Sequence, residues 1–179
     1  DVLKIFGMAF NFGTILLNGG DGDDGGDGGY IYMGAGSLVI QTGTVNSSGG
    51  MGLVSSGGAA GDMDFYTSIG TSYFSGMLLA NGGAGETKGG DAGYVDIESG
   101  YLGNLISDAD IETKGGNGNA ANAGAGNYIE FENYAGETLI AGSITTSGGS
   151  SVSGVGGNGG SFEINCEYDD GWGESYIPC

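Results

Sequence analysis

The sequence predicts an all-β protein, a single-stranded parallel β-helix of about five coils with three strands per coil. A repeat begins at Gly13, Gly43, Gly76, Ala109 and Gly142, with spacings of 30, 33, 33 and 33 residues, and such periods indicate stacked structural units. Apolar and polar residues alternate in short segments, as in half-buried strands. No segment shows a sustained helical period, and the many glycines disfavour helices. We expect right-handed winding, from the crossover rule for parallel strands.

The first segment of each repeat carries one apolar column, followed by a glycine pair and a Gly-rich loop that should protrude at one corner. The column comprises Ile15, Val45, Leu78, Ile111 and Ile144. The pairs are Gly19-Gly20, Gly49-Gly50, Gly82-Gly83, Gly115-Gly116 and Gly148-Gly149. Because the loops recur at one corner and contain small residues, we expect them to stack as a thin ridge.

The second and third segments complete the coil. The second alternates strictly, as in Met63-Asp64-Phe65 and Val95-Asp96-Ile97. A bulky residue and a glycine then mark a corner, where glycine would accept a positive φ at no steric cost. These corners are Ile69-Gly70, Leu102-Gly103 and Ala135-Gly136, with Ala35-Gly36 one position out of register. The third segment carries Ile40, Tyr73, Ile106 and Leu139, each three residues before the next repeat.

The repeat extends to both ends, so residues 1–179 form one domain. Residues 2–5 match a second strand, Phe6-Gly7 a corner and Phe10 a third strand, while Trp172-Gly173 and Tyr176 match the last corner and third strand. The expected division is a partial coil at 1–12 and coils at 13–42, 43–75, 76–108, 109–141 and 142–179.

Composition excludes several functions. The chain has 22 acidic residues, 3 lysines and no histidine, for a net charge of −19. Nucleic-acid binding requires a basic footprint and is not expected. No apolar run is long enough to insert in a membrane. Without histidine there is no Ser-His-Asp or Cys-His arrangement, and no loop gathers acids into a cleft, so we expect no enzyme. The outward positions of the first strand, such as Thr14 and Leu16, are too irregular for ice binding.

One acidic loop is a candidate metal site. Residues 19–27 read GGDGDDGGD and resemble the Ca²⁺-binding nonapeptide of RTX proteins, GGxGxDxUx. Gly26 stands where that family needs a large apolar residue. Asp21, Asp23, Asp24 and Asp27 could supply oxygen ligands, with Ca²⁺ as the expected cofactor, and the alternative is a solvated acidic loop.

Two outward columns belong to the second strand. Asp64, Asp96, Glu130 and Glu163 should stack on one another, where a cation would relieve their repulsion. Tyr30, Tyr94 and Tyr128 should form a neighbouring column that either covers the sheet or contributes to a glycan-binding face.

The cysteines and the first residue bear on localisation. Cys166 and Cys179 both fall in the last coil, and a disulfide between them is favoured over two free thiols. Asp1 falls at the start of a strand, which suggests a mature chain whose leader has been removed. Asn46-Ser47-Ser48 is an N-glycosylation sequon, a pattern that is common by chance.

With its repeat laid out, the chain resembles the Gly-rich parallel β-helices of secreted bacterial and archaeal surface proteins, including adhesin passenger domains and fibre subunits. The resemblance covers nearly all 179 residues but rests on the repeat pattern and not on a diagnostic motif. It implies an extracellular structural protein that polymerises with copies of itself, or a cell-surface adhesin that binds glycans or cations.

The two ends favour head-to-tail assembly. A β-helix ends in open strand edges that invite pairing, and neither end shows an amphipathic helix that could cap it. The expected interface joins the first coil to the last and sets Lys4 over Glu163. Its residues are Leu3, Lys4, Ile5, Phe6 and Phe10 at one end and Phe162, Glu163, Ile164, Trp172 and Tyr176 at the other.

Overall fold

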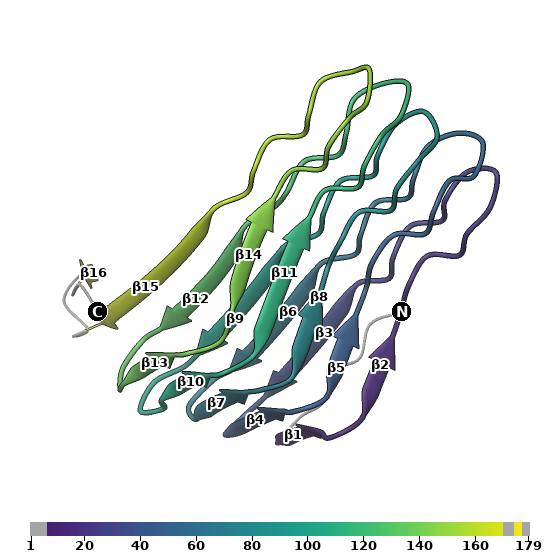
Figure 1. Ribbon diagram of the computed structural model, residues 1–179. Helices are drawn as coiled ribbons and strands as arrows, with labels where there is room; N and C mark the ends of the chain where they lie inside the picture. The colour runs from purple at the N-terminus through teal and green to yellow at the C-terminus, as the bar shows by residue number, and fades with distance from the viewer. Residues whose placement is uncertain (1–6, 170–173, 177–179) are drawn as a thin grey trace.

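The computed structural model describes residues 7–169 and 174–176. The chain is a parallel β-solenoid of five coils built from three sheets, as the repeat predicts (Figure 1). Sheet 1 contains β2 (Thr14–Leu16), β5 (Thr44–Asn46), β8 (Met77–Leu79), β11 (Asp110–Lys114) and β14 (Ile144–Ser147). Sheet 2 contains β3 (Ile31–Ala35), β6 (Met63–Thr67), β9 (Val95–Ser99), β12 (Ile129–Asn133), β15 (Phe162–Asp169) and β16 (Glu174–Tyr176). Sheet 3 contains β1 (Met8–Asn11), β4 (Leu38–Gln41), β7 (Thr71–Phe74), β10 (Leu105–Ser107) and β13 (Thr138–Ile140).

Every strand from β1 to β15 pairs in parallel with its equivalents in the neighbouring coils, in the register of the sequence repeat. In sheet 1, Ile15 pairs with Val45, Val45 with Leu78, and Leu78 with Ile111. Sheets 2 and 3 keep the same rule, so each residue of a strand stacks on its repeat equivalent. A column in the aligned repeats is therefore a column in space.

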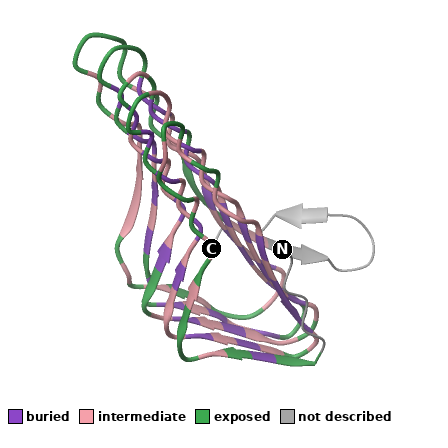
Figure 2. Cartoon of the chain, turned by 90° about the vertical axis from the view of Figure 1, so that its right-hand side faces the viewer, coloured by how far each residue is buried: buried purple, intermediate pink, exposed green. Residues whose placement is uncertain are grey.

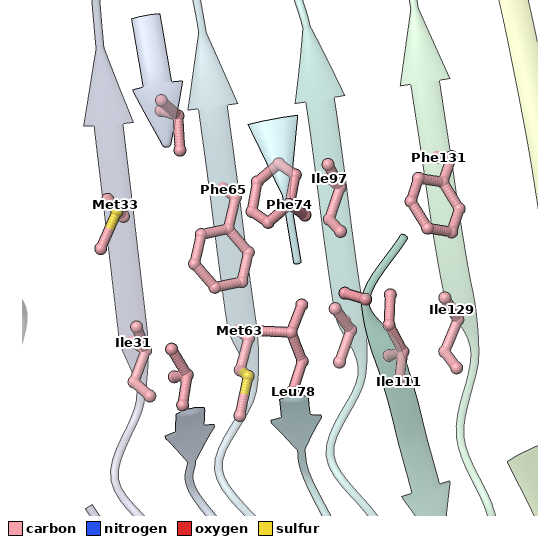
Figure 3. Packing of buried hydrophobic residues seen from close by; sticks show 14 of the residues in the cluster. Ile31, Met33, Met63, Phe65, Phe74, Leu78, Ile97, Ile111, Ile129 and Phe131 are labelled. Atoms are coloured by element: carbon pink, nitrogen blue, oxygen red, sulfur yellow. The ribbon is translucent and has the colours of Figure 1, made fainter. Parts of the chain in front are cut away.

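The core fills the interior between the three sheets (Figure 3). Sheet 2 contributes two inward columns, one of which runs through Met33, Phe65, Ile97 and Phe131, each at most 1% exposed. Phe74 of sheet 3 meets Phe65 edge to face, with 5.0 Å between the ring centroids. Burial of such side chains stabilises the fold by roughly 1.5–3 kcal/mol each.

The apolar column of the third segment faces outward. Ile40 pairs with Tyr73, and Tyr73 with Ile106, but their strand neighbours Val39 and Phe74 are the fully buried residues. The inward positions of sheet 3 include polar side chains such as Gln41 and Ser72, which is why the apolar pattern alone does not identify the inward face.

The corner glycines are needed mainly for close approach between coils, contrary to the positive-φ explanation. Among the four corner glycines, Gly136 has a positive φ, of 106°. A methyl group on Gly70 would lie 1.6 Å from the carbonyl oxygen of Ser37 in the preceding coil. A positive φ also occurs at the exposed Leu102, at 70°.

The C-terminal coil differs from the prediction. Tyr176 was expected in a third strand on sheet 3, but β16 pairs antiparallel with the end of β15, Glu167 opposite Tyr176. Sheet 3 therefore ends at β13. Trp172, expected at the last corner, lies outside the described residues.

Candidate functional site

The outward face of sheet 2 concentrates acids and tyrosines. Asp64, Asp96, Glu130 and Glu163 pair with one another in register, as predicted. A second acidic pair, Glu98 and Glu132, lies two residues further along the same strands. Because neighbouring strands are about 4.8 Å apart, these carboxylates repel one another.

Asp96 lies at the centre of this column and is affected most. Its Oδ1 atom is buried without a hydrogen-bond partner among the described residues. Burial, followed by the charges of Glu130, Asp64 and Glu132, raises the pKa of Asp96 from 3.8 to about 6. The column therefore holds a proton more tightly than a solvated aspartate does.

Tyrosines surround the acids. The Tyr30 hydroxyl donates to Asp64 Oδ2, and the Tyr94 hydroxyl donates to the same oxygen at 3.3 Å. Burial, and then these interactions with Asp64, raise the pKa values of Tyr30 and Tyr94. Tyr94 and Tyr128 stack with ring centroids 4.9 Å apart. A shallow hollow of about 300 Å³ on this face is lined by Tyr32, Asp64, Phe65, Tyr66, Tyr94, Asp96 and Glu98.

The acidic loop has a structural role in the described geometry. Asp21 Oδ1 accepts a hydrogen bond from the backbone N–H of Met51, at 2.7 Å, and Asp27 Oδ1 accepts one from Ala59, at 2.8 Å. Asp24 makes a longer contact with Ser56, and Asp23 accepts through its carbonyl oxygen. Each of these four aspartates therefore accepts a hydrogen bond from a backbone N–H group of the next coil.

The same arrangement recurs along the protein, where Asp or Asn side chains accept from the coil that follows. Examples are Asp62 with Tyr94, Asp91 with Ala125, Asn117 with Ser150 and Asn122 with Val155. Within residues 7–169 and 174–176, no group of three or more acidic or cysteine side chains is placed to hold a metal ion. The Ca²⁺ hypothesis thus receives no support from this geometry.

The Gly-rich loops form an ordered ridge of two layers. In Figure 2 it rises from the body as a thin blade with exposed residues at its tip. One layer contains the outgoing glycines Gly20, Gly50, Gly83, Gly116 and Gly149, and the other contains the returning glycines Gly26, Gly58, Gly90, Gly124 and Gly157.

A single chain of nine hydrogen bonds connects the two layers. The N–H of each returning glycine donates to the outgoing glycine of its own coil, and the N–H of the next outgoing glycine donates to that returning glycine. Gly26 donates to Gly20, Gly50 to Gly26, Gly58 to Gly50, and so on to Gly157, all at 2.8–3.0 Å. We call this the glycine ladder.

The ladder explains why glycine recurs in these columns. A methyl group on Gly83 would lie 1.9 Å from the carbonyl oxygen of Gly50, and one on Gly116 would lie 1.9 Å from that of Gly83. None of the ladder glycines has a positive φ, so the requirement is close packing of backbones. Gly20 and Gly26, in the first of the described coils, are the exceptions: a methyl group on Gly20 has no atom within 4 Å, and one on Gly26 would lie 3.1 Å from the backbone nitrogen of Gly20.

The predicted assembly residues are only partly described. Leu3, Lys4, Ile5, Phe6 and Trp172 lie outside the described residues. Phe162 and Ile164 continue two core columns but are 44% and 40% exposed, whereas the preceding members of those columns are at most 1% exposed. Phe10 is 46% exposed on the outward face of sheet 3, and Glu163 is exposed.

The disulfide between Cys166 and Cys179 remains a prediction. Cys166 ends the stretch of β15 that pairs with β12, and its sulfur lies 3.8 Å from the Thr138 hydroxyl. Cys179 lies outside the described residues.

Comparisons with family models, with curated proteins and with solved structures each found no match for this chain. Within the described part of the chain, no helix is long and apolar enough to cross a membrane. The surfaces of the solenoid are therefore the guide to its function. The sequence alone predicted the acidic column but not the glycine ladder. The invariant glycine pair of the repeat is the signal that could have revealed it.

Proposed function

We propose that this chain is an extracellular structural protein, the subunit of a filament or surface fibre that grows by head-to-tail stacking of coils. The observation that carries the proposal is the pair of ends of the glycine ladder. Among the described residues, the N–H of Gly20 has no backbone acceptor and the carbonyl oxygen of Gly157 has no backbone donor. The repeat rule would join these two groups if the first coil of one protomer followed the last coil of another.

The strand count supports the same junction. From β1 to β15 the chain supplies five strands to each sheet, a whole number of coils. A following protomer can add β1 to β13, β2 to β14 and β3 to β15 without leaving a gap. β16 pairs only with residues 167–169, beyond the stretch of β15 that pairs with β12. A contact between two different surfaces yields an open filament unless its rotation closes a ring.

Stacking β3 on β15 differs from the junction expected from the sequence, which sets Lys4 over Glu163. We favour the new junction because the earlier one leaves sheets 1 and 3 one strand short where the two protomers meet. The new junction requires that residues 1–6 leave the edge of β3 free. The exposed part of Phe162 and Ile164 would then be covered, which stabilises the junction by roughly 2 kcal/mol for each side chain.

The test uses Gly20→Ala. In the isolated protomer the new methyl group meets nothing within 4 Å, so the melting temperature should not fall. Methyl groups on Gly50 and Gly83 would lie 1.9–2.2 Å from a carbonyl oxygen of the preceding coil. In the filament, the methyl group on Gly20 would meet the last coil of the preceding protomer in the same way. Gly20→Ala should therefore fold normally and fail to assemble.

The control is Ala120→Ser, which adds one atom to an exposed residue of the ridge in the fourth coil, away from both ends of the protomer. Electron microscopy of the purified proteins should show filaments for the parent and for Ala120→Ser, and dispersed particles for Gly20→Ala. Lys4→Glu should assemble normally, and a chain beginning at Gly7 should assemble at least as well as the parent. Filaments of Gly20→Ala, or no filaments of the parent, would refute the proposal.

A second candidate is a monomeric surface adhesin that binds glycans or cations. It is favoured by the hollow on sheet 2, where tyrosine rings and carboxylates lie together. Dispersed parent protein that binds an immobilised glycan, with loss of binding in Tyr66→Ala, would support this candidate over the filament.

A further inference from the structure

The outward face of sheet 3 carries an unbroken apolar column. Phe10 pairs with Ile40, Ile40 with Tyr73, Tyr73 with Ile106 and Ile106 with Leu139, one residue from each strand. The two end residues are 46% and 60% exposed, and the three between them are partly exposed. Met8 and Leu38 extend the apolar surface in the adjacent column. We call this surface the sheet 3 face.

Charge distinguishes this face from the other two. The strands of sheet 3 read MAFN, LVIQ, TSYF, LIS and TLI, without a charged residue. Sheet 1 carries Asp110, Glu112 and Lys114, and sheet 2 carries the acidic column. In a chain of net charge −19, two copies repel each other over most orientations. The sheet 3 face is where two copies can approach with least charge between them.

We propose that two filaments of this protein pair laterally through the sheet 3 face, apolar column against apolar column. The occupant of the face is therefore a second copy of the chain, and the inference rests on the proposed stacking.

Area explains why stacking must come first. Five strands about 4.8 Å apart and about 13 Å long give a face of about 300 Å² per protomer. A stable interface needs about 800 Å² from each partner. One protomer is too small to pair through this face alone, whereas about three stacked protomers present enough. Pairing should thus depend on filament length.

The test is Tyr73→Glu, which places a charge at the centre of the column where the side chain is partly exposed. Ile106→Glu repeats the test at the next strand. The matched control is Thr44→Glu, which adds the same charge to the outward face of sheet 1 beside the uncharged Thr14 and Met77. Filament width by negative-stain electron microscopy is the readout, with melting temperature as the check on folding.

The parent and Thr44→Glu should form paired filaments, and Tyr73→Glu and Ile106→Glu should form single filaments of similar length. Gly20→Ala protomers should remain monomeric by light scattering at concentrations where the parent pairs. Single parent filaments, or paired filaments of folded Tyr73→Glu, would overturn lateral pairing while leaving stacking intact. Absence of any parent filament would overturn both.

Discussion

Replacing Asp96 with asparagine tests whether the acidic column of sheet 2 opposes folding. Asp96 lies between Asp64 and Glu130, and its buried Oδ1 has no hydrogen-bond partner among the described residues. Asparagine keeps the size of the side chain and removes the charge. Its amide group can also donate to a neighbouring carboxylate, as Asn165 Nδ2 donates to Glu130 Oε1 at 2.6 Å.

The gain in stability expected for Asp96→Asn follows from the raised pKa of Asp96. Because the folded protein holds the Asp96 proton up to about pH 6 and the unfolded chain only to about 3.8, folding is favoured by protonation. This stability is fully present below about pH 3.8 and is lost as the pH rises to about 6. A difference of that size corresponds to about 3 kcal/mol, and solvent screening of a partly exposed group reduces it to about 1–2 kcal/mol.

The assay is chemical unfolding of Asp96→Asn and of the parent, followed by circular dichroism from pH 3.5 to 8. The variant should match the parent below pH 4 and exceed it by about 1–2 kcal/mol above pH 6. Glu163→Gln, at the exposed end of the same column, is the control and should change stability less. A stability difference that does not depend on pH, or a variant less stable than the parent at pH 7, would refute the repulsion argument.

Three further predictions concern the ridge, the acidic loop and the cysteines. Gly83→Ala should lower stability by about 3 kcal/mol through overpacking, measured by thermal unfolding, while Gly20→Ala should not. Asp27→Asn keeps the acceptor for the N–H of the next coil and should melt near the parent, whereas Asp27→Ala should lose about 0.5–1.5 kcal/mol. If Ca²⁺ raises the melting temperature of the parent and not of Asp27→Asn, the loop is a metal site instead. Intact mass after alkylation without reduction should show no modified thiol if Cys166 and Cys179 are joined, and two labelled thiols would contradict the disulfide.

The fold was predictable because a parallel solenoid converts sequence period into spatial register. Once the repeats are aligned, a column such as Val45, Leu78 and Ile111 must stack, since each strand pairs with its equivalent one coil away. The acidic column was predictable for the same reason. Alternation also identified the inward face of sheet 2, where the inward residues are apolar and the outward ones polar.

Alternation failed for sheet 3, where both faces mix apolar and polar residues. Tyr73 points outward and Ser72 inward, because the interior can accept a hydroxyl that finds a partner, here Thr67 Oγ1 at 3.1 Å. The role of Asp27 was also hidden, because its partner is a backbone N–H that carries no side-chain signature. β16 turns back and pairs antiparallel with β15. The repeat pattern could not predict this, because it assumes that every coil follows the same course.

The glycine ladder gives the protein a direction. All nine of its hydrogen bonds donate from a residue later in the chain to an earlier one, five of them within a coil and four from one coil to the coil before it. Aligned hydrogen bonds polarise one another, which leaves a partial positive charge at the Gly20 end and a partial negative charge at the Gly157 end. Two such ends attract head to tail and repel head to head. A filament built on this ridge would therefore be polar, with two chemically different ends. The rates of elongation at the two ends need not be equal.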